Sequence, residues 1–349
     1  MTTTKQTERE ALSAQGSSQA EPLTARGAPE HVEEVGGAPN PKLGTGPSGA
    51  KRGSSRPPEE GLSLDANQAA RLKEVAEGLA SATAAPAKSP TLPRIMAIAN
   101  QKGGVGKTTT AVNLGAALAE LGYRVLVVDL DPQGNATTGL GVNARNLDSS
   151  IYDVILHDVP IEDCIEPTSL RNLFLIPATI DLAGAEIELV PVFSRELRLK
   201  RALATVTDDF DYVLIDCPPS LGLLTVNALA AAGEVAVPIQ CEYYPLEGLG
   251  QLLRNIERVR ANLNPGLSVS TIIMTMYDAR TRLAEQVVEE VRNHFGDRVC
   301  RNVVPRTVRL SEAPSFGQPI ILFDPTSRGA TAYRELAKEV SGGAAQRVG

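Results

Sequence analysis

The chain has 349 residues, of which 42% are hydrophobic, so it is long enough to form one large core or two domains. Its formal net charge of −7 does not indicate a nucleic-acid-binding protein. No apolar run approaches the roughly 18 residues of a transmembrane helix, and the first residues lack the apolar core of a secretion signal. Four scattered cysteines without a C-x-x-C pair fit reduced thiols, so we expect a cytoplasmic protein.

The first 93 residues differ in composition from the rest of the chain. Residues 1–64 are rich in Gly, Pro, Ser, Thr, Ala, Glu and Gln, which predicts a disordered extension. Residues 65–93 are predicted to hold one amphipathic helix, between Asp65 and Ala84, followed by a linker. Its role stays open: it could dock on the core, bind a partner, or remain unfolded.

A glycine-rich loop lies between a short apolar run, Ile95–Ala99, and a helical pattern from Thr108 to Leu121. This context is typical of a phosphate-binding loop, in which backbone N–H groups and a helix N-terminus surround phosphate oxygens. The alternative is a glycine-rich turn without a ligand. We predict nucleotide contacts from eight consecutive residues: Lys102, Gly103, Gly104, Val105, Gly106, Lys107, Thr108 and Thr109.

The loop contains two lysines where the usual G-x-x-x-x-G-K-[ST] pattern requires one. Lys107 is expected to hold the β- and γ-phosphates, and the Thr108 hydroxyl is placed to ligate Mg²⁺. Lys102, at the mouth of the loop, could then reach a different nucleotide. This suggests a dimer in which each subunit completes the other's site.

Two further apolar runs end in carboxylates, at residues 124–131 and 211–216. Ligands bind outside the carboxyl ends of parallel strands, so both runs direct their acidic residues toward the edge that carries the loop. Asp216 has the position of a Walker B aspartate, which holds Mg²⁺, although a turn residue before Pro218 is the alternative. Asp131 begins a sequence that equally resembles an ordinary turn.

Strands and helices are predicted to alternate over residues 94–340, ahead of a flexible tail at 341–349. This pattern indicates an α/β fold: a single P-loop NTPase domain with a mostly parallel sheet and helices on both faces. The further predicted strands are Leu173–Ile176, Val235–Ile239, Val269–Met274, Val299–Val303 and Ile320–Leu322. The further predicted helices are Leu182–Val190, Ser194–Val206, Leu221–Ala232, Leu246–Asn262, Arg282–Phe295 and Gly329–Val340.

Three long motifs resemble those of the ParA/Soj family of partitioning ATPases, within the deviant Walker A group that includes MinD. They lie at residues 100–109, 129–137 and 213–219, and similar segments follow at 277–281 and 305–315. The resemblance covers about residues 94–340. It does not extend to the residues that precede them.

The resemblance implies an ATPase that uses ATP and Mg²⁺ and forms a homodimer when ATP binds. Lys102 would cross the dimer to the partner's phosphates, and Asp131 would position the attacking water. Adenine contacts would lie around Asn302–Arg306. A ParB-type DNA-binding protein would stimulate hydrolysis, and the cycle would drive chromosome or plasmid partitioning on the nucleoid.

The segment from Arg254 to Arg309 has ten arginines and six acidic residues inside an otherwise acidic domain. Such a run is often only a solvated face, and this alternative stays open. The resemblance implies that Arg280 and Arg309 contact DNA without sequence preference. The weaker candidates are Arg254, Arg258, Arg260, Arg282, Arg301 and Arg306.

Two other functions are compatible with a nucleotide-binding loop of this kind. A MinD-like, membrane-associated positioning ATPase needs a terminal amphipathic helix, which residues 339–349 cannot form, so no membrane binding is expected. A nucleotide-gated scaffold for cargo adaptors would hydrolyse almost no ATP. The presence of Lys102 and Asp131 argues against the scaffold.

Overall fold

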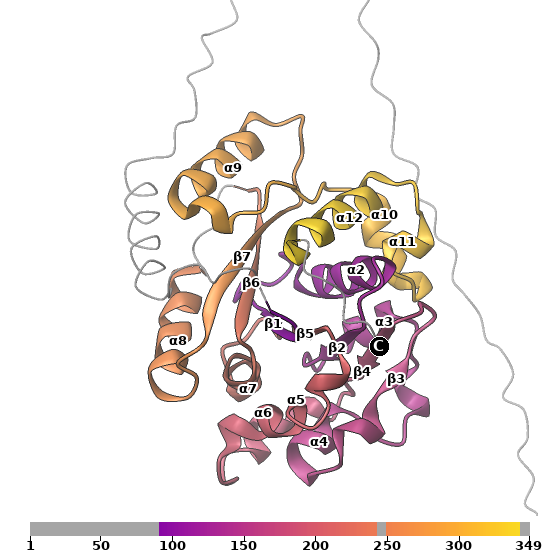
Figure 1. Ribbon diagram of the computed structural model, residues 1–349, viewed down its shortest axis with the longest axis vertical. Helices are drawn as coiled ribbons and strands as arrows, with labels where there is room; N and C mark the ends of the chain where they lie inside the picture. Colours follow the sequence, from indigo (N-terminus) through magenta and orange to yellow (C-terminus); the bar gives the residue numbers. More distant parts are fainter. Residues whose placement is uncertain (1–90, 243–248, 343–349) are drawn as a thin grey trace, which may run out of the picture. The chain divides into compact units, whose positions relative to one another are not determined.

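The computed structural model describes residues 91–242 and 249–342, which form a layered α/β structure (Figure 1). The helix predicted between Asp65 and Ala84, the extension before it and the end of the tail lie outside the described residues. One seven-stranded sheet has the order β3-β4-β2-β5-β1-β6-β7. Its strands are β1 (Arg94–Ile98), β2 (Val125–Asp129), β3 (Glu166–Pro167), β4 (Leu173–Ile176), β5 (Tyr212–Asp216), β6 (Glu234–Gln240) and β7 (Ser268–Thr275).

All strands except the short edge strand β3 run parallel, which confirms the mostly parallel sheet. Strand β5 lies between β1 and β2, although it follows both in the chain. Its last residue, Asp216, is in register with Ile98 of β1 and with Asp129 of β2. The carboxyl ends of the three central strands therefore meet in one row.

Helices cover both faces of the sheet, as the alternation of strands and helices predicts (Figure 1). One face carries α2 (Lys107–Glu120), α3 (Asn135–Gly139), α10 (Val308–Glu312), α11 (Ile320–Phe323) and α12 (Arg328–Ser341). The other carries α4 (Ile151–His157), α5 (Leu182–Glu188), α6 (Arg198–Leu203), α7 (Leu223–Ala231), α8 (Leu249–Asn262) and α9 (Arg282–Phe295). Short 3₁₀ turns lie at Ala144–Asn146, Ile161–Cys164, Arg195–Leu197, Thr207–Asp209, Gly296–Arg298 and Ala313–Phe316.

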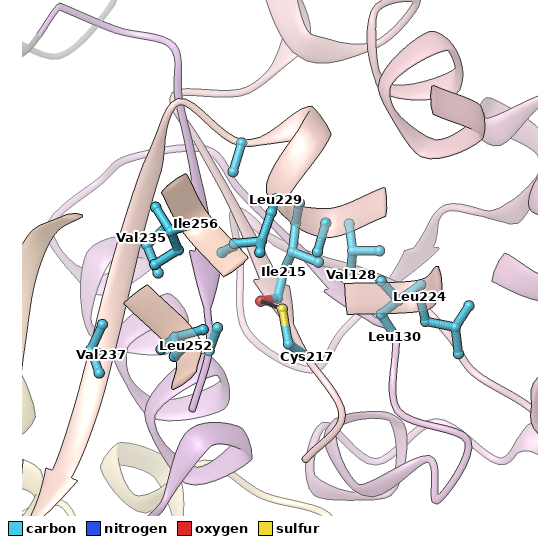
Figure 2. Close-up of a cluster of buried hydrophobic side chains, with 14 of the residues drawn as sticks. Val128, Leu130, Ile215, Cys217, Leu224, Leu229, Val235, Val237, Leu252 and Ile256 are labelled. Carbon is cyan, nitrogen blue, oxygen red and sulfur yellow. Dashed lines mark hydrogen bonds between the residues drawn. The ribbon is translucent and has the colours of Figure 1, made fainter. Parts of the chain in front are cut away.

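The alternation of side chains along the strands produces two apolar cores. In β5, Tyr212 and Leu214 face the α2 layer, whereas Val213 and Ile215 face the α7 layer. Figure 2 shows the second core, where Ile215 lies among side chains of β2, β6, α7 and α8. Because both faces are covered, the central strands are apolar throughout except at their ends.

Two predicted strands are wrong. Residues 299–303 contribute only an isolated bridge, Val299 to Ile272, so they do not extend the sheet. Ile320–Leu322 lies in helix α11, where the Asn113 side chain accepts the Ile320 N–H at 2.6 Å. A three-residue apolar run has no readable period, and a partner more than 200 residues away decided its conformation.

Other differences concern short elements. Helices α3, α4 and α10 had no sequence prediction. The helix expected over 194–206 is divided between a 3₁₀ turn and α6. All four cysteines are buried and form no disulfide. Among the described residues, no helix is long and apolar enough to span a membrane.

Candidate functional site

The glycine-rich loop joins β1 to α2 at the carboxyl edge of the sheet. Gly104 has a φ of 73°, and Gly106, which caps α2, has a φ of 89°, so both adopt the left-handed conformation that glycine tolerates best. A Cβ atom added at Gly103 or Gly104 would meet no atom within 4 Å. The loop therefore leaves open space at the start of a 14-residue helix, as a phosphate cradle requires.

Side chains from the start of the loop and from β7 hold it in place. The Asn100 amide donates to Pro238 O at 2.7 Å and accepts the Lys102 N–H at 3.0 Å. The Thr275 hydroxyl lies 2.8 Å from Val105 O and 3.2 Å from Ile239 O. The ends of β6 and β7 thus fix the loop, and neither contact follows from the loop motif itself.

The two loop lysines occupy different environments. Lys107 is buried, and its Nζ lies 3.3 Å from the carbonyl oxygen of Lys102. Burial lowers the pKa of Lys107, and the nearby carboxylates of Asp216 and Asp131 offset this only in part. Lys102 is only partly buried. The buried lysine is therefore directed inward along the loop, and the second one stands nearer the surface.

Asp216 is fully buried, and neither oxygen of its side chain has a hydrogen-bond partner among the described residues. Burial, followed by the charge of Asp129, raises the pKa of Asp216 well above its usual value. The nearby Thr108 side chain and the positive charge of Lys107 lower this pKa, but by less. An unpartnered buried carboxylate costs free energy unless a cation or a proton compensates it. Asp216 beside Thr108 therefore fits a Mg²⁺ site.

A magnesium ion at this position would depend on few protein ligands. Over residues 91–242 and 249–342, no group of three or more His, Cys, Asp or Glu side chains is arranged to hold a metal. Mg²⁺ at nucleotide sites takes most of its oxygen ligands from phosphates and water, with one or two from protein. One carboxylate and one hydroxyl suffice for such a site.

Asp129 is a buried carboxylate whose role the sequence pattern did not indicate. The N–H and the hydroxyl of Thr137 both lie 2.7 Å from its Oδ2, and the Asp131 N–H lies 3.2 Å from its Oδ1. Burial raises the pKa of Asp129 to about 6, with hydrogen bonds from Thr137 opposing the rise. Its place at the end of a buried strand was the available signal.

Asp131 is nearly buried, two residues beyond the end of β2. Its Oδ1 accepts the Gln133 N–H at 3.0 Å, and its carbonyl oxygen accepts the Gly134 N–H at 2.9 Å. Asp131 is thus part of a hydrogen-bonded turn, as its sequence suggested, and also one of three carboxylates that gather at the strand ends. The two interpretations of Asp131 are compatible.

A cavity of about 290 Å³ opens between the loop and the C-terminal part of the domain. Two segments that pair at residues 277 and 305 form one wall, with hydrogen bonds of 3.0 Å from Tyr277 N to Val304 O and from Arg306 N to Tyr277 O. The size is at the lower end for a small-molecule site. The lining residues are Gly106, Thr109, Thr275, Met276, Val304, Pro305, Arg306, Thr307, Leu310, Ser311, Pro314 and Tyr333.

The cavity begins where the phosphate loop ends, so it can receive a base attached to phosphates in that loop. Three of the five residues in the segment expected to contact adenine line it: Val304, Pro305 and Arg306. Asn302 does not. Its backbone and side-chain nitrogens instead bind Glu339, at 3.2 and 3.0 Å.

Both arginines predicted to contact DNA are exposed but already ion-paired. The Arg280 guanidinium binds Asp278 through two bonds, of 2.9 and 2.6 Å. Arg309 lies 3.2 Å from Glu312 and 3.2 Å from Asp324. The bridge between Tyr277 and Pro305 pairs the segment before Arg280 with the segment before Arg309. Both arginines therefore follow, within a few residues, the paired segments that form the cavity wall. The weaker candidates are in α8 (Arg254, Arg258 and Arg260), at the start of α9 (Arg282) and in the segment after it (Arg301 and Arg306).

A family model and several known proteins match this chain over most of the described residues. The model of a family described as an AAA domain matches residues 93–269. The chain is 60% identical over 248 residues to the sporulation initiation inhibitor protein Soj of Bacillus subtilis, covering 71% of this chain and 98% of the relative. It is 55% identical over 250 residues to the chromosome partitioning protein ParA of Myxococcus xanthus, covering 72% and 88%.

Solved structures cover a similar share of this chain. One is a Mycobacterium smegmatis protein named cobyrinic acid a,c-diamide synthase, with bound ADP and magnesium. It shares 45% sequence identity and a TM-score of 0.63, over 71% of this chain and 93% of that chain.

Proposed function

This chain belongs to the family of Soj and ParA chromosome-partitioning ATPases, and from that premise we propose that ATP switches it into a DNA-binding dimer. It is a P-loop ATPase, and its cofactors are ATP and Mg²⁺. The dimer, its DNA contacts and its ParB-type partner are the proposed part. The observation that carries the proposal is the partly buried Lys102 beside the inward-directed Lys107.

Within one subunit, the proposed roles follow from placement. Lys107 and the loop N–H groups bind the phosphates, and Thr108 and Asp216 would hold Mg²⁺. The bound ion would neutralise charge on the β- and γ-phosphates. Asp131 would orient the attacking water. Hydrogen bonds with Gln133 and Asp129 hold Asp131 itself in place. Base binding would use the cavity next to Gly106.

Between subunits, Lys102 would reach the partner's γ-phosphate. Phosphoryl transfer depends mainly on positioning and on stabilising charge, so a cation supplied in trans acts as an arginine finger does. Hydrolysis would then require the dimer. Loss of the γ-phosphate would remove one of the contacts between the two subunits.

The dimer would double the surface that carries Arg280 and Arg309, and so make DNA binding depend on ATP. Contacts of arginine with phosphate carry no sequence information and weaken as salt is added. A ParB-type protein would stimulate hydrolysis and release the dimer from DNA. Repeated cycles would move the partner's DNA cargo over the nucleoid.

The test is DNA retention by the full chain with ATP, ADP or no nucleotide, at several salt concentrations. Retention with ATP alone, falling with salt and lost in Lys102→Ala, is the expected result. Retention that ignores the nucleotide contradicts the proposal. Retention on liposomes instead of DNA would favour the MinD-like alternative.

Two other functions, a nucleotide-gated scaffold and a synthase, differ from the proposed one in testable ways. The scaffold is favoured if Lys102→Ala and Asp131→Ala leave partner-stimulated hydrolysis unchanged. The synthase activity named for the Mycobacterium smegmatis protein is not proposed for this chain, because relatives with higher identity are partitioning proteins.

A further inference from the structure

Four large apolar side chains are exposed within 14 residues of one another, on α5 and the segments that flank it. We call them the α5 patch: Ile180 (71% exposed), Ile187 (77%), Val190 (57%) and Phe193 (89%). Seven large hydrophobic side chains are exposed among the described residues, and these are four of them. Exposed large apolar side chains that gather in one segment of a surface often mark an interaction site.

The α5 patch is held outward by ordered structure. Leu182 and Ala185 bury the opposite side of α5, so Ile187 cannot turn inward without exposing them. The Val192 N–H binds Leu189 O at 3.0 Å, and Ser194 has a φ of 53°. These features present Phe193 on a fixed turn, which lowers the entropy lost when it packs against another surface.

The segment that carries the α5 patch lies against residues near the nucleotide site on two sides. The Ala178 N–H donates to the Thr137 hydroxyl at 3.0 Å, and Thr137 in turn binds Asp129. On the other side, the Glu186 carboxylate lies so close to Gly222 that an added Cβ would meet its Oε1. Gly222 is in the connection that follows Asp216. The α5 patch therefore starts from the same carboxyl edge of the sheet as Lys102.

We propose that the α5 patch is the apolar part of an interface with a second copy of this chain. This rests on the proposed function, because a lysine that acts in trans brings this edge of the sheet against the partner's. A stable interface buries roughly 800 Å² per partner around a water-excluding centre, often an aromatic anchor. Lys102 and the phosphates supply charge but no such centre, and Phe193 and Ile187 can.

The other exposed apolar residues fit a second copy less well. Val308, Phe316 and Leu322 lie around the C-terminal helices, and Phe316 already packs against Phe323 with ring centroids 4.9 Å apart. The neighbouring Arg309 is ion-paired with Asp324. These side chains are on segments that pack against α2, in the opposite helix layer from α5.

The experiment is sedimentation of the full chain with Mg²⁺ and a non-hydrolysable ATP analogue. The variants are Phe193→Asp and Ile187→Glu, and Val308→Asp is the matched control because it removes an equally exposed apolar side chain elsewhere. We expect the dimer dissociation constant to rise about tenfold or more in both patch variants and to stay near wild type in the control. Binding of the analogue to the monomer should be unchanged, as should the thermal unfolding temperature.

The experiment distinguishes a failure of the proposed function from a failure of the inference about the α5 patch. A wild-type chain that stays monomeric with the analogue overturns both the proposed function and this inference. A dimer that forms in wild type, and equally well in both patch variants, overturns the inference alone. Patch variants that dimerise normally but lose stimulation by a ParB-type partner would also overturn it, and would assign the α5 patch to that partner.

Discussion

Replacing Asp129 with Asn should stabilise the nucleotide-free protein at neutral pH. Burial raises the pKa of Asp129 to about 6 from an ordinary 3.8, so the folded state holds this proton more tightly than the unfolded state. The carboxylate therefore lowers the free energy of unfolding progressively as the pH rises from about 4 to about 6. At about 1.4 kcal/mol per pKa unit, its cost above pH 6 is about 3 kcal/mol.

The Asn side chain recovers most of this cost but not all of it. Its oxygen can still accept both bonds from Thr137, whereas its NH₂ group faces the Asp131 N–H that now donates to Oδ1 at 3.2 Å. Losing that bond costs about 1 kcal/mol, which leaves a net gain of about 2 kcal/mol at pH 7.5.

Urea unfolding from pH 4 to 8, in EDTA and without nucleotide, measures this effect. Asp129→Asn should show a smaller fall in stability between pH 4 and 6 than wild type, because the buried Asp216 still contributes to it. Asp297→Asn, which changes an exposed acid, should show the full fall. A variant that is less stable than wild type at pH 7.5, or that has the same pH dependence, would refute the argument from burial.

Four further outcomes are expected. Lys107→Ala should lose most nucleotide affinity by calorimetry, because the only buried cation of the loop is removed. Asp131→Ala should abolish ATP hydrolysis while ATP-dependent retention on DNA persists; release at the wild-type rate would argue against its role with water. Arg280→Glu should lose DNA in a filter-binding assay but keep dimerisation, and undiminished DNA affinity would exclude it from the contact surface. Asp278→Asn should increase DNA affinity severalfold at low salt, because it frees the Arg280 guanidinium. A gain no larger than that of Asp297→Asn would show that the loss of one negative charge explains the effect without Arg280.

The sequence alone was sufficient for the phosphate loop, because every signal there is local. The strand, the two glycines with positive φ and the helix follow one another within 27 residues, Arg94–Glu120. The apolar runs that end in Asp129 and Asp216 were equally readable, since a strand buried on both faces has a continuous apolar pattern. These patterns predicted the fold class and the set of groups at one edge.

Where the sequence failed, distant partners made the decision. Ile320 became helical against Asn113, and residues 135–139 formed a helix whose Thr137 hydroxyl accepts the N–H of Ala178, 41 residues away. The base-sized cavity combines residues 106–109 with residues 275–333, which no local pattern connects. The ion pairs that occupy Arg280 and Arg309 were likewise invisible in a count of charges.

The sequence by itself determined which chemical groups the protein has: two lysines in one loop, a threonine, and acidic residues at the ends of strands. Only the tertiary structure decided that β5 lies between β1 and β2, which brings Asp216 beside Asp129 and leaves its oxygens unpartnered. It also decided that one side of α5 is buried while Ile187 and Phe193 face solvent. The physical reason is that strand order and burial depend on contacts between residues far apart in the chain, whereas loop and helix signals depend on neighbours.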